Sequence, residues 1–216
     1  MSFNLYRQRV KADIPNSEYS NNEIMKTIKD EFYSMPNYYE VYKNGDTSDL
    51  YDVVINEGDK DDKVLGYKKL ISYPYPTPQF SSGDLIYWNN EIWLLTTLDK
   101  QYLYGVKGRI IQCNKTLTFT KNSTSYSVPC VVGSIGQNLG LNTETSRYIS
   151  DIDDEILVRC QSNSTTGLIA INNVFTIGRS NWKVINISDV LEENTLILKM
   201  KWVADAPVTT EQGGWW

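Results

Sequence analysis

The stretch FSSGDLIYWNNEIWLLTTLDKQYLYGVKGRIIQCNKTLTFTKNSTSYSVPCVV, residues 80–132, alternates short apolar runs with turn-forming residues. The runs at 85–88 and 92–98 are separated by Asn89 and Asn90, a tight polar turn of the kind that joins the strands of a hairpin. Three more strand-like runs follow, RIIQCN, KTLTFT and SYSVPCV. Closely spaced short strands with such turns predict a small closed β-barrel.

One helix is expected upstream of this barrel, at residues 21–35. Ile24, Ile28 and Phe32 recur at i, i+4 and i+8 and form a single apolar stripe. We expect this stripe to pack on a sheet. The polar residues 1–20 that precede the helix predict an extended arm.

The region between the helix and the barrel reads as strands separated by turns, up to residue 72. It includes the acidic segment EGDKDDK at 57–63. A cation site there is one interpretation, but the oxygen spacing is irregular and the glutamate that closes an EF-hand loop is missing, so a solvated loop is expected. The alternating prolines of YPYPTPQ, residues 73–79, predict an extended spacer, with a recognition motif for a partner as the alternative.

The second half of the chain contains a weak echo of the first. Residues 172–203 resemble 83–98: each begins with a strand, a turn containing Gly or Asn and a further strand carrying one tryptophan, Trp93 in one copy and Trp182 in the other. A true duplication would imply two stacked barrels or one extended barrel. The alternative is that any two hairpins look alike.

The chain ends in ADAPVTTEQGGWW, a polar tail that finishes with Trp215 and Trp216. Tryptophan is enriched at binding hot spots, so this pair is a candidate anchor in a neighbour's pocket. Packing of the pair on its own barrel is the alternative.

The fold class predicted from these patterns is mostly β, with one or two small β-barrel or sandwich domains, a short N-terminal helix and extended termini. The predicted segments are an N-terminal arm at 1–20, a helix plus strands at 21–72, a small β-barrel at 73–132, a long loop at 133–154, a second β region that completes or repeats the barrel at 155–204, and a C-terminal tail at 205–216.

The composition argues against an enzyme. The 216 residues include no histidine, which removes the commonest general base and metal ligand and makes a Ser/His/Asp triad impossible. The three cysteines are too dispersed for a zinc site, and no phosphate-binding glycine motif occurs. We therefore expect no catalytic, cofactor-binding or metal-binding residues. The net charge of −5 argues against a strong grip on nucleic acid, and no apolar run reaches the ~18–20 residues of a membrane-spanning helix.

A carbohydrate-binding or hydrolytic β protein is the alternative from another class. Paired carboxylates can hydrolyse glycosides, and aromatic side chains can stack on sugars. Core packing is the competing explanation for the tryptophans. The residues concerned are Asp151, Asp153, Asp154 and Glu155 as the acids and Trp88, Trp93, Trp182 and Trp202 as the platform.

The sequence GDLIYWNNEIWLLTTLD, followed by YLYGVKGRIIQCNKTLTF and SVPCVV, resembles structural proteins of tailed bacteriophages that infect Gram-positive hosts, of the neck or head-closure type. The second half matches that pattern only loosely, around Trp182, and the extra C-terminal sandwich of longer relatives is absent. The residues that carry the resemblance, taken as a barrel-core motif, are Gly83, Asp84, Trp88, Trp93, Cys113, Asn114 and Trp182.

This resemblance implies a virion structural protein that forms a ring of barrel domains between portal and tail, a head–tail connector. Its implied partners are copies of itself, portal or adaptor proteins, and tail or capsid proteins, with passive contact with packaged DNA and none with a membrane. Its implied location is the virion, after assembly in the host cytoplasm. A capsid decoration or tail-associated protein is the alternative within the same biology.

Overall fold

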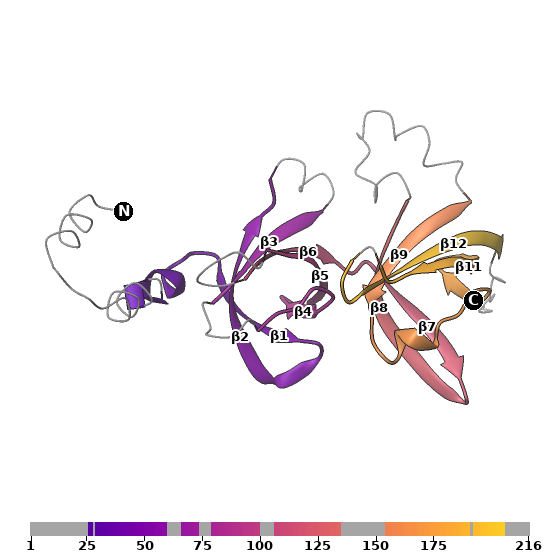
Figure 1. Ribbon diagram of the computed structural model, residues 1–216, viewed down its shortest axis with the longest axis horizontal. Helices are drawn as coiled ribbons and strands as arrows, with labels where there is room; N and C mark the ends of the chain where they lie inside the picture. The colour runs from indigo at the N-terminus through magenta and orange to yellow at the C-terminus, as the bar shows by residue number, and fades with distance from the viewer. Residues whose placement is uncertain are drawn as a thin grey trace, which may run out of the picture.

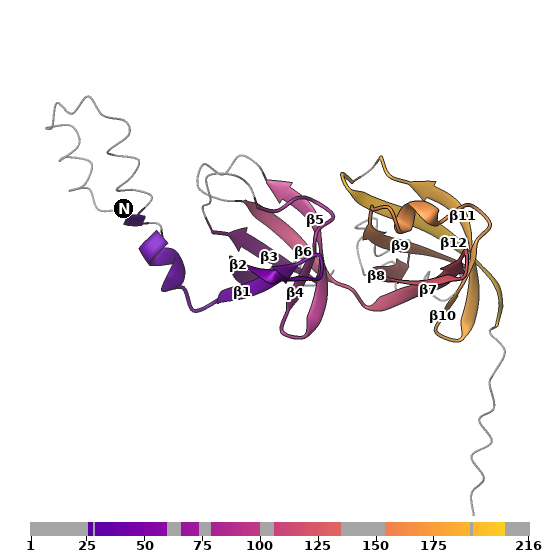
Figure 2. The same ribbon diagram turned by 90° about the horizontal axis from the view of Figure 1, so that it is seen from below.

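The computed structural model describes residues 26–27, 29–59, 66–73, 79–99, 106–134, 154–190 and 192–205. These residues form a short helix near the N-terminus and two six-stranded β units that follow one another along the long axis (Figures 1 and 2). The prediction of a mostly β fold is confirmed.

The first unit contains β1 (Tyr38–Lys43), β2 (Asp46–Glu57), β3 (Tyr67–Ser72), β4 (Leu85–Trp88), β5 (Glu91–Asp99) and β6 (Lys107–Gln112). The second contains β7 (Lys115–Lys121), β8 (Thr124–Ser134), β9 (Glu155–Gln161), β10 (Val174–Ile177), β11 (Ser180–Ser188) and β12 (Thr195–Asp205), with a 3₁₀ turn at Thr166–Leu168.

The first unit is a closed antiparallel barrel with the strand order β1-β2-β3-β6-β5-β4. It closes where β4 pairs with β1, with Tyr87 opposite Tyr42. Alternate residues of each strand point inward, as the two-residue period of a strand requires. The interior is apolar and includes the fully buried Val41, Leu70 and Ile110.

The second unit repeats this topology. Its order, β7-β8-β9-β12-β11-β10, is that of the first barrel with six added to each strand number. The hairpins β4–β5 and β10–β11 each consist of a four-residue strand, a two-residue turn and a nine-residue strand. Trp93 and Trp182 are the third residues of the two longer strands. The predicted repeat is therefore present in the structure as two units of equal strand order.

The hairpin turns have the backbone geometry that the sequence predicts. Asn89 and Asn90 have φ values of 53° and 61°, as a two-residue turn with both central residues left-handed requires. The turn between β7 and β8 is similar, with φ values of 52° at Asn122 and 64° at Ser123. Asparagine tolerates this region better than most residues, so the local sequence specifies these turns.

The two sheets group the strands differently from the predicted segments. The predicted barrel at 73–132 combines strands that belong to two units: β1–β3 complete the first barrel, whereas β7 and β8 belong to the second sheet. The reason is long-range pairing, since β3 bonds to β6 and β1 to β4, and a strand-like run does not reveal its partner. Of the predicted loop at 133–154, residues 135–153 lie outside the described residues.

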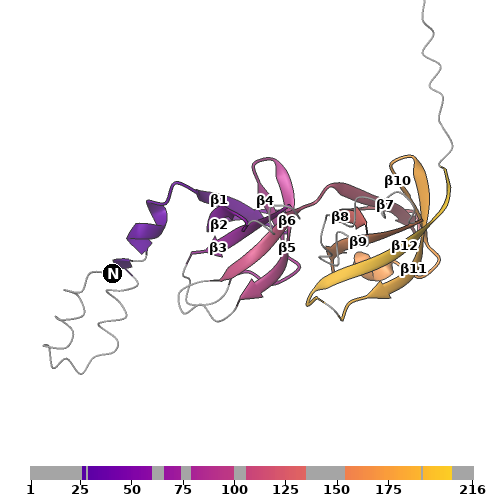
Figure 3. The ribbon, with the colours of Figure 1, turned by 90° about the horizontal axis from the view of Figure 1, so that it is seen from above.

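The helix, which includes residues 26–27 and 29–33, lies beside the first barrel (Figure 3). Phe32 is buried, and its ring lies 6.1 Å from that of Tyr38 and 5.5 Å from that of Tyr73. The expected packing of the apolar stripe is thus seen at Phe32, whereas Ile24 and Ile28 lie outside the described residues.

Candidate functional site

The predicted motif residues Gly83 and Asp84 lie at the joint between the first barrel and the second, barrel-like unit. Gly83 has a φ of +87°, and a Cβ atom placed on it would lie 2.1 Å from the backbone oxygen of Asn194, in the turn before β12. The first barrel therefore touches the second backbone to backbone at this position. Only glycine permits both the left-handed conformation and the close approach.

Asp84 anchors a polar network that crosses the joint. Its carboxylate accepts hydrogen bonds from the side-chain amide of Asn44, at 2.8 Å, and from the backbone N–H of Ser81, at 2.8 Å. The side-chain oxygen of Asn44 accepts from the N–H of Leu85 and from the side chain of Gln161, both at 2.8 Å. Because Gln161 belongs to β9, this network ties the first barrel to the second.

An apolar cluster fills the same joint. Leu85 and Leu94 of the first barrel and Val131 of β8 are buried against one another, and Cys113 packs on them. Burial of these side chains disfavours separation of the barrels, because it would return apolar surface to water.

A second polar contact lies beside this cluster. Arg159 stands opposite both Val131 and Ile197 in the second sheet, so the three form one row across β8, β9 and β12. Its guanidinium donates a hydrogen bond to the hydroxyl of Tyr67 in β3, at 3.0 Å, and pairs with Glu192 at 3.3 Å. The joint thus combines backbone contact, apolar packing and charge-assisted hydrogen bonds.

Cys113 and Asn114 form the link between the barrels, between β6 and β7. The N–H of Cys113 donates to the carbonyl of Ile92 at 2.8 Å. The side chain of Asn114 makes two hydrogen bonds of 2.8 Å with the backbone of Val132, one as donor and one as acceptor. One residue of the link is therefore held by the first barrel and the next by the second.

The predicted tryptophan platform for sugars does not form. Trp93 lies in the core of the first barrel with 4% of its surface exposed. The ring centre of the half-buried Trp88 lies 5.6 Å from that of Trp93. Trp182 and Trp202 stand opposite each other in the second sheet. The four rings are therefore divided between the two units, and Trp202 is 40% exposed on the second sheet.

Of the predicted acidic groups, Glu155 has a structural partner and Asp154 is exposed. Glu155 pairs with Lys199 at 2.7 Å, whereas 151–153 lie outside the described residues. In the acidic segment 57–63, Glu57 pairs with Lys68 and Asp59 with Lys69. Within the described part of the chain, no group of three Cys, Asp or Glu side chains is arranged to hold a metal ion.

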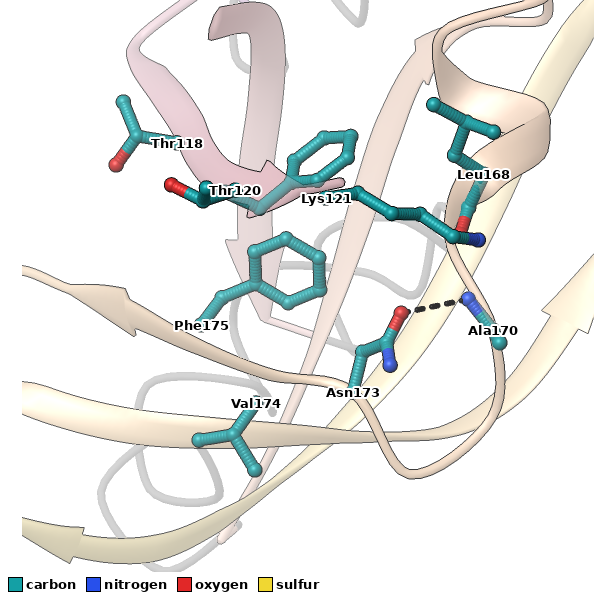
Figure 4. Close-up of a pocket in the computed structure, with 9 residues that line it drawn as sticks. Thr118, Thr120, Lys121, Leu168, Ala170, Asn173, Val174 and Phe175 are labelled. Atoms are coloured by element: carbon teal, nitrogen blue, oxygen red, sulfur yellow. Dashed lines mark hydrogen bonds between the residues drawn. The ribbon is translucent and has the colours of Figure 1, made fainter. Parts of the chain in front are cut away.

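The second sheet has an open seam where the first barrel closes. Its end strands β7 and β10 correspond to β1 and β4 but are not paired in the sheet. They meet through side chains: the rings of Phe119 and Phe175 lie 5.8 Å apart, edge to face. A pocket of about 350 Å³ opens along this seam, and Lys121 reaches across it to the carbonyl of Leu168 at 3.0 Å (Figure 4). Its lining mixes phenyl rings, hydroxyls and one ammonium.

Two buried cysteines in the second sheet, both free thiols, contribute to the dependence of stability on pH in the alkaline range. Cys130 and Cys160 stand opposite each other and are fully buried. Burial raises the pKa of each thiol from 9.0 to about 12. Because the folded state holds these protons more tightly than the unfolded state, their contribution to stability is complete below pH 9 and is lost as the pH rises through about 12.

We therefore expect the free energy of unfolding, measured in urea at a series of pH values, to fall between pH 9 and 12. In the variant Cys160→Ala the fall should be shallower. An equally steep fall in that variant would contradict the assignment to buried thiols.

No helix among the described residues has the length and apolar character needed to span a bilayer. The proposed anchors Trp215 and Trp216 lie outside the described residues.

One protein family is similar to the second sheet. Residues 110–201 match the family model of the YomX C-terminal domain. The matched segment begins in β6 and ends in β12, and so includes nearly the whole second sheet. No curated protein and no solved structure matches the chain. The second barrel-like unit is therefore similar to a phage-related protein family.

Proposed function

We propose that this chain is a non-catalytic structural subunit of a tailed phage particle, and that it forms a head–tail connector ring at the neck. The observation that carries the proposal is the similarity of residues 110–201 to a phage-related family. The neck assignment rests in addition on the resemblance of the motif around Gly83, Trp88 and Trp93 to head-closure proteins.

The joint between the barrels supports a mechanical role. A ring subunit has to transmit contacts from one neighbour to the next without bending. Here the close contact of Gly83 with Asn194, the Asn44–Gln161 bond and the apolar cluster around Val131 hold the two units together. Many such subunits in a ring reinforce one another, because each contact raises the effective concentration for the next.

The proposed partners are further copies of the chain, a portal or adaptor protein, and tail or capsid proteins. A capsid decoration or tail-associated protein is the second candidate. A connector and a decoration protein differ in copy number, since a connector forms one ring per particle and a decoration protein covers the shell. The carbohydrate-binding alternative loses support, because Trp93 is buried and the four tryptophans are divided between two units.

Two measurements test this function. Mass spectrometry of purified phage particles should detect the chain at the copy number of a single ring, and gold labelling should place it at the neck. Many copies spread over the capsid would favour decoration. Absence from the particle would overturn the structural role.

The C-terminal tail gives a prediction about assembly. We expect deletion of residues 206–216 to leave thermal unfolding unchanged, because all the described strands end by residue 205. We expect assembly to weaken by at least about tenfold in half-assembly concentration, since buried tryptophans are frequent hot spots of 2 kcal/mol or more. The matched variant, Trp215→Ala with Trp216→Ala in the full chain, should reproduce the loss. Unchanged assembly, measured by analytical ultracentrifugation, would rule out the anchor role.

A further inference from the structure

The outer face of the first barrel carries an acidic strip on β1 and β2. Glu40 lies directly opposite Asp52 in the register of the two strands. Their neighbours Val41 and Val53 are fully buried in the barrel, so Glu40 and Asp52 point outward. Like charges placed directly opposite each other across two strands destabilise a sheet. The hydroxyls of Tyr33 and Tyr38 donate hydrogen bonds to the Asp52 carboxylate, at 3.1 and 2.6 Å, and offset part of this cost, but the repulsion between Asp52 and Glu40 remains.

Exposed apolar side chains flank the acidic strip. Tyr33, at the end of the helix, is 50% exposed and donates a hydrogen bond from its hydroxyl to Asp52 at 3.1 Å. Leu50, two residues before Asp52 on the same face of β2, is also 50% exposed, and Met35 is 41% exposed. Apolar groups beside a charged row are the composition of a protein interface, in which burial contributes affinity and charges contribute orientation.

A basic strip lies on the outer face of β3 and β6. Lys69 stands directly opposite Arg109, and Lys107 is two residues away on the same face of β6. Their neighbours Leu70 and Ile110 are fully buried inside the barrel. Asp59 pairs with Lys69 at 2.6 Å and Asp99 of β5 stands opposite Lys107, so the strip keeps one cation in excess of these two carboxylates. It is thus the electrostatic complement of the acidic strip.

The two strips lie on different sides of one barrel. Strand β2 pairs with β3, but Asp52 lies four residues before Asn56, the residue of β2 that stands opposite Lys69, and in Figure 1 the labels of β3 and β6 lie at the top of the barrel while that of β1 lies at the bottom. A chain cannot bring its own two strips together, whereas two copies can. Contacts between different patches of identical subunits are heterologous, and they close into a ring when the rotation allows.

We propose that the acidic strip of one copy, Glu40 and Asp52, docks onto the basic strip of the next copy, Lys69, Lys107 and Arg109. This inference rests on the proposed ring and names its self-contact. The contact places opposite charges against both like-charge pairs and covers Tyr33 and Leu50. It also predicts that assembly weakens as salt is raised, because the charges at its rim are screened.

Two charge reversals test the contact, Glu40→Lys and Arg109→Glu. Each converts a like-charge cross-strand pair into an opposite-charge pair, so the melting temperature of the subunit should stay the same or rise. Each also opposes like charges across the proposed contact, so the half-assembly concentration should rise at least about tenfold. The control reversals Lys115→Glu and Asp189→Lys, at exposed positions of the second unit, should assemble normally.

Complementation makes the test specific for a head-to-tail contact. The double variant E40K/R109E should assemble like the wild type, since every contact again joins opposite charges. An equal mixture of the two single variants should also assemble, by alternation, although neither assembles alone. Normal assembly of either single variant, or failure of both complementations, would overturn the contact.

The outcomes separate this inference from the proposed function. A wild-type chain that stays monomeric overturns the self-contact, yet the chain can still be detected at the neck of purified particles. A ring that forms with unaltered affinity in E40K and R109E also overturns the contact and leaves the connector role standing.

Discussion

The substitution Gly83→Ala should lower the free energy of unfolding by about 3–5 kcal/mol, at the upper end of the range for single substitutions. Two costs combine. Alanine at a φ of +87° is strained by about 1–2 kcal/mol. Its Cβ would also lie 2.1 Å from the backbone oxygen of Asn194, so the two barrels would have to move apart and expose the cluster around Val131. Urea denaturation followed by tryptophan fluorescence measures the loss.

Two other glycines separate these costs. Gly66 has a φ of +75°, and a Cβ placed on it would have no atom of the described residues within 4 Å, so Gly66→Ala should show the backbone strain alone, about 1–2 kcal/mol. Gly167 has no left-handed φ, and a Cβ placed on it would have no atom of the described residues within 4 Å. Gly167→Ala should therefore be neutral or stabilise by up to about 1 kcal/mol. If Gly83→Ala costs no more than Gly66→Ala, the close contact at the joint is not what constrains residue 83.

The second large effect is expected at Trp93, where Trp93→Ala should destabilise the first barrel by about 3–5 kcal/mol. The side chain is 4% exposed and lies in the barrel core, so its loss leaves a cavity lined by apolar groups. Because the joint couples the units, unfolding should begin in the first barrel. Chemical denaturation gives the magnitude, and hydrogen exchange shows which strands lose protection.

Two comparisons test the interpretation of Trp93 as a core residue. Trp202 is 40% exposed, so Trp202→Ala should cost well under half as much. The indole N–H of Trp93 is buried and has no hydrogen-bond partner among the described residues. Trp93→Phe therefore loses no hydrogen bond there. It should lower the free energy of unfolding by less than Trp93→Ala does. Near-wild-type melting of Trp93→Ala would contradict the core position.

The local elements could be predicted because each depends on neighbours in the chain. The alternation of apolar residues indicates which face of a strand is buried, and Asn89 and Asn90 favour the turn that they form. The burial of Phe32 follows from the apolar stripe of its helix in the same way. Even the likeness between the hairpins of Trp93 and Trp182 is a local pattern, and the equal strand orders confirm it.

The joint could be predicted only in part. Gly83, Asp84, Cys113 and Asn114 stand out by their motif, but nothing near them identifies the second barrel as their partner. Gln161, which bonds to Asn44, lies 117 residues away from it in the chain. The Asn44-Gly45 pair is a signal for a hairpin turn, and it holds no information about this cross-barrel bond.

The amino-acid sequence alone determined the mostly β class, the hairpins and the burial of Trp93, because strand period and turn chemistry act over a few residues. Tertiary structure decided that β1–β3 complete the first barrel, that β7 and β8 join the second, and that Glu40 meets Asp52 while Lys69 meets Arg109. The physical reason is the register of strand pairing. The alternation of side chains along a strand indicates which face of the sheet a residue occupies. Its neighbour across the sheet depends on which distant strand pairs with its own strand, and at what offset.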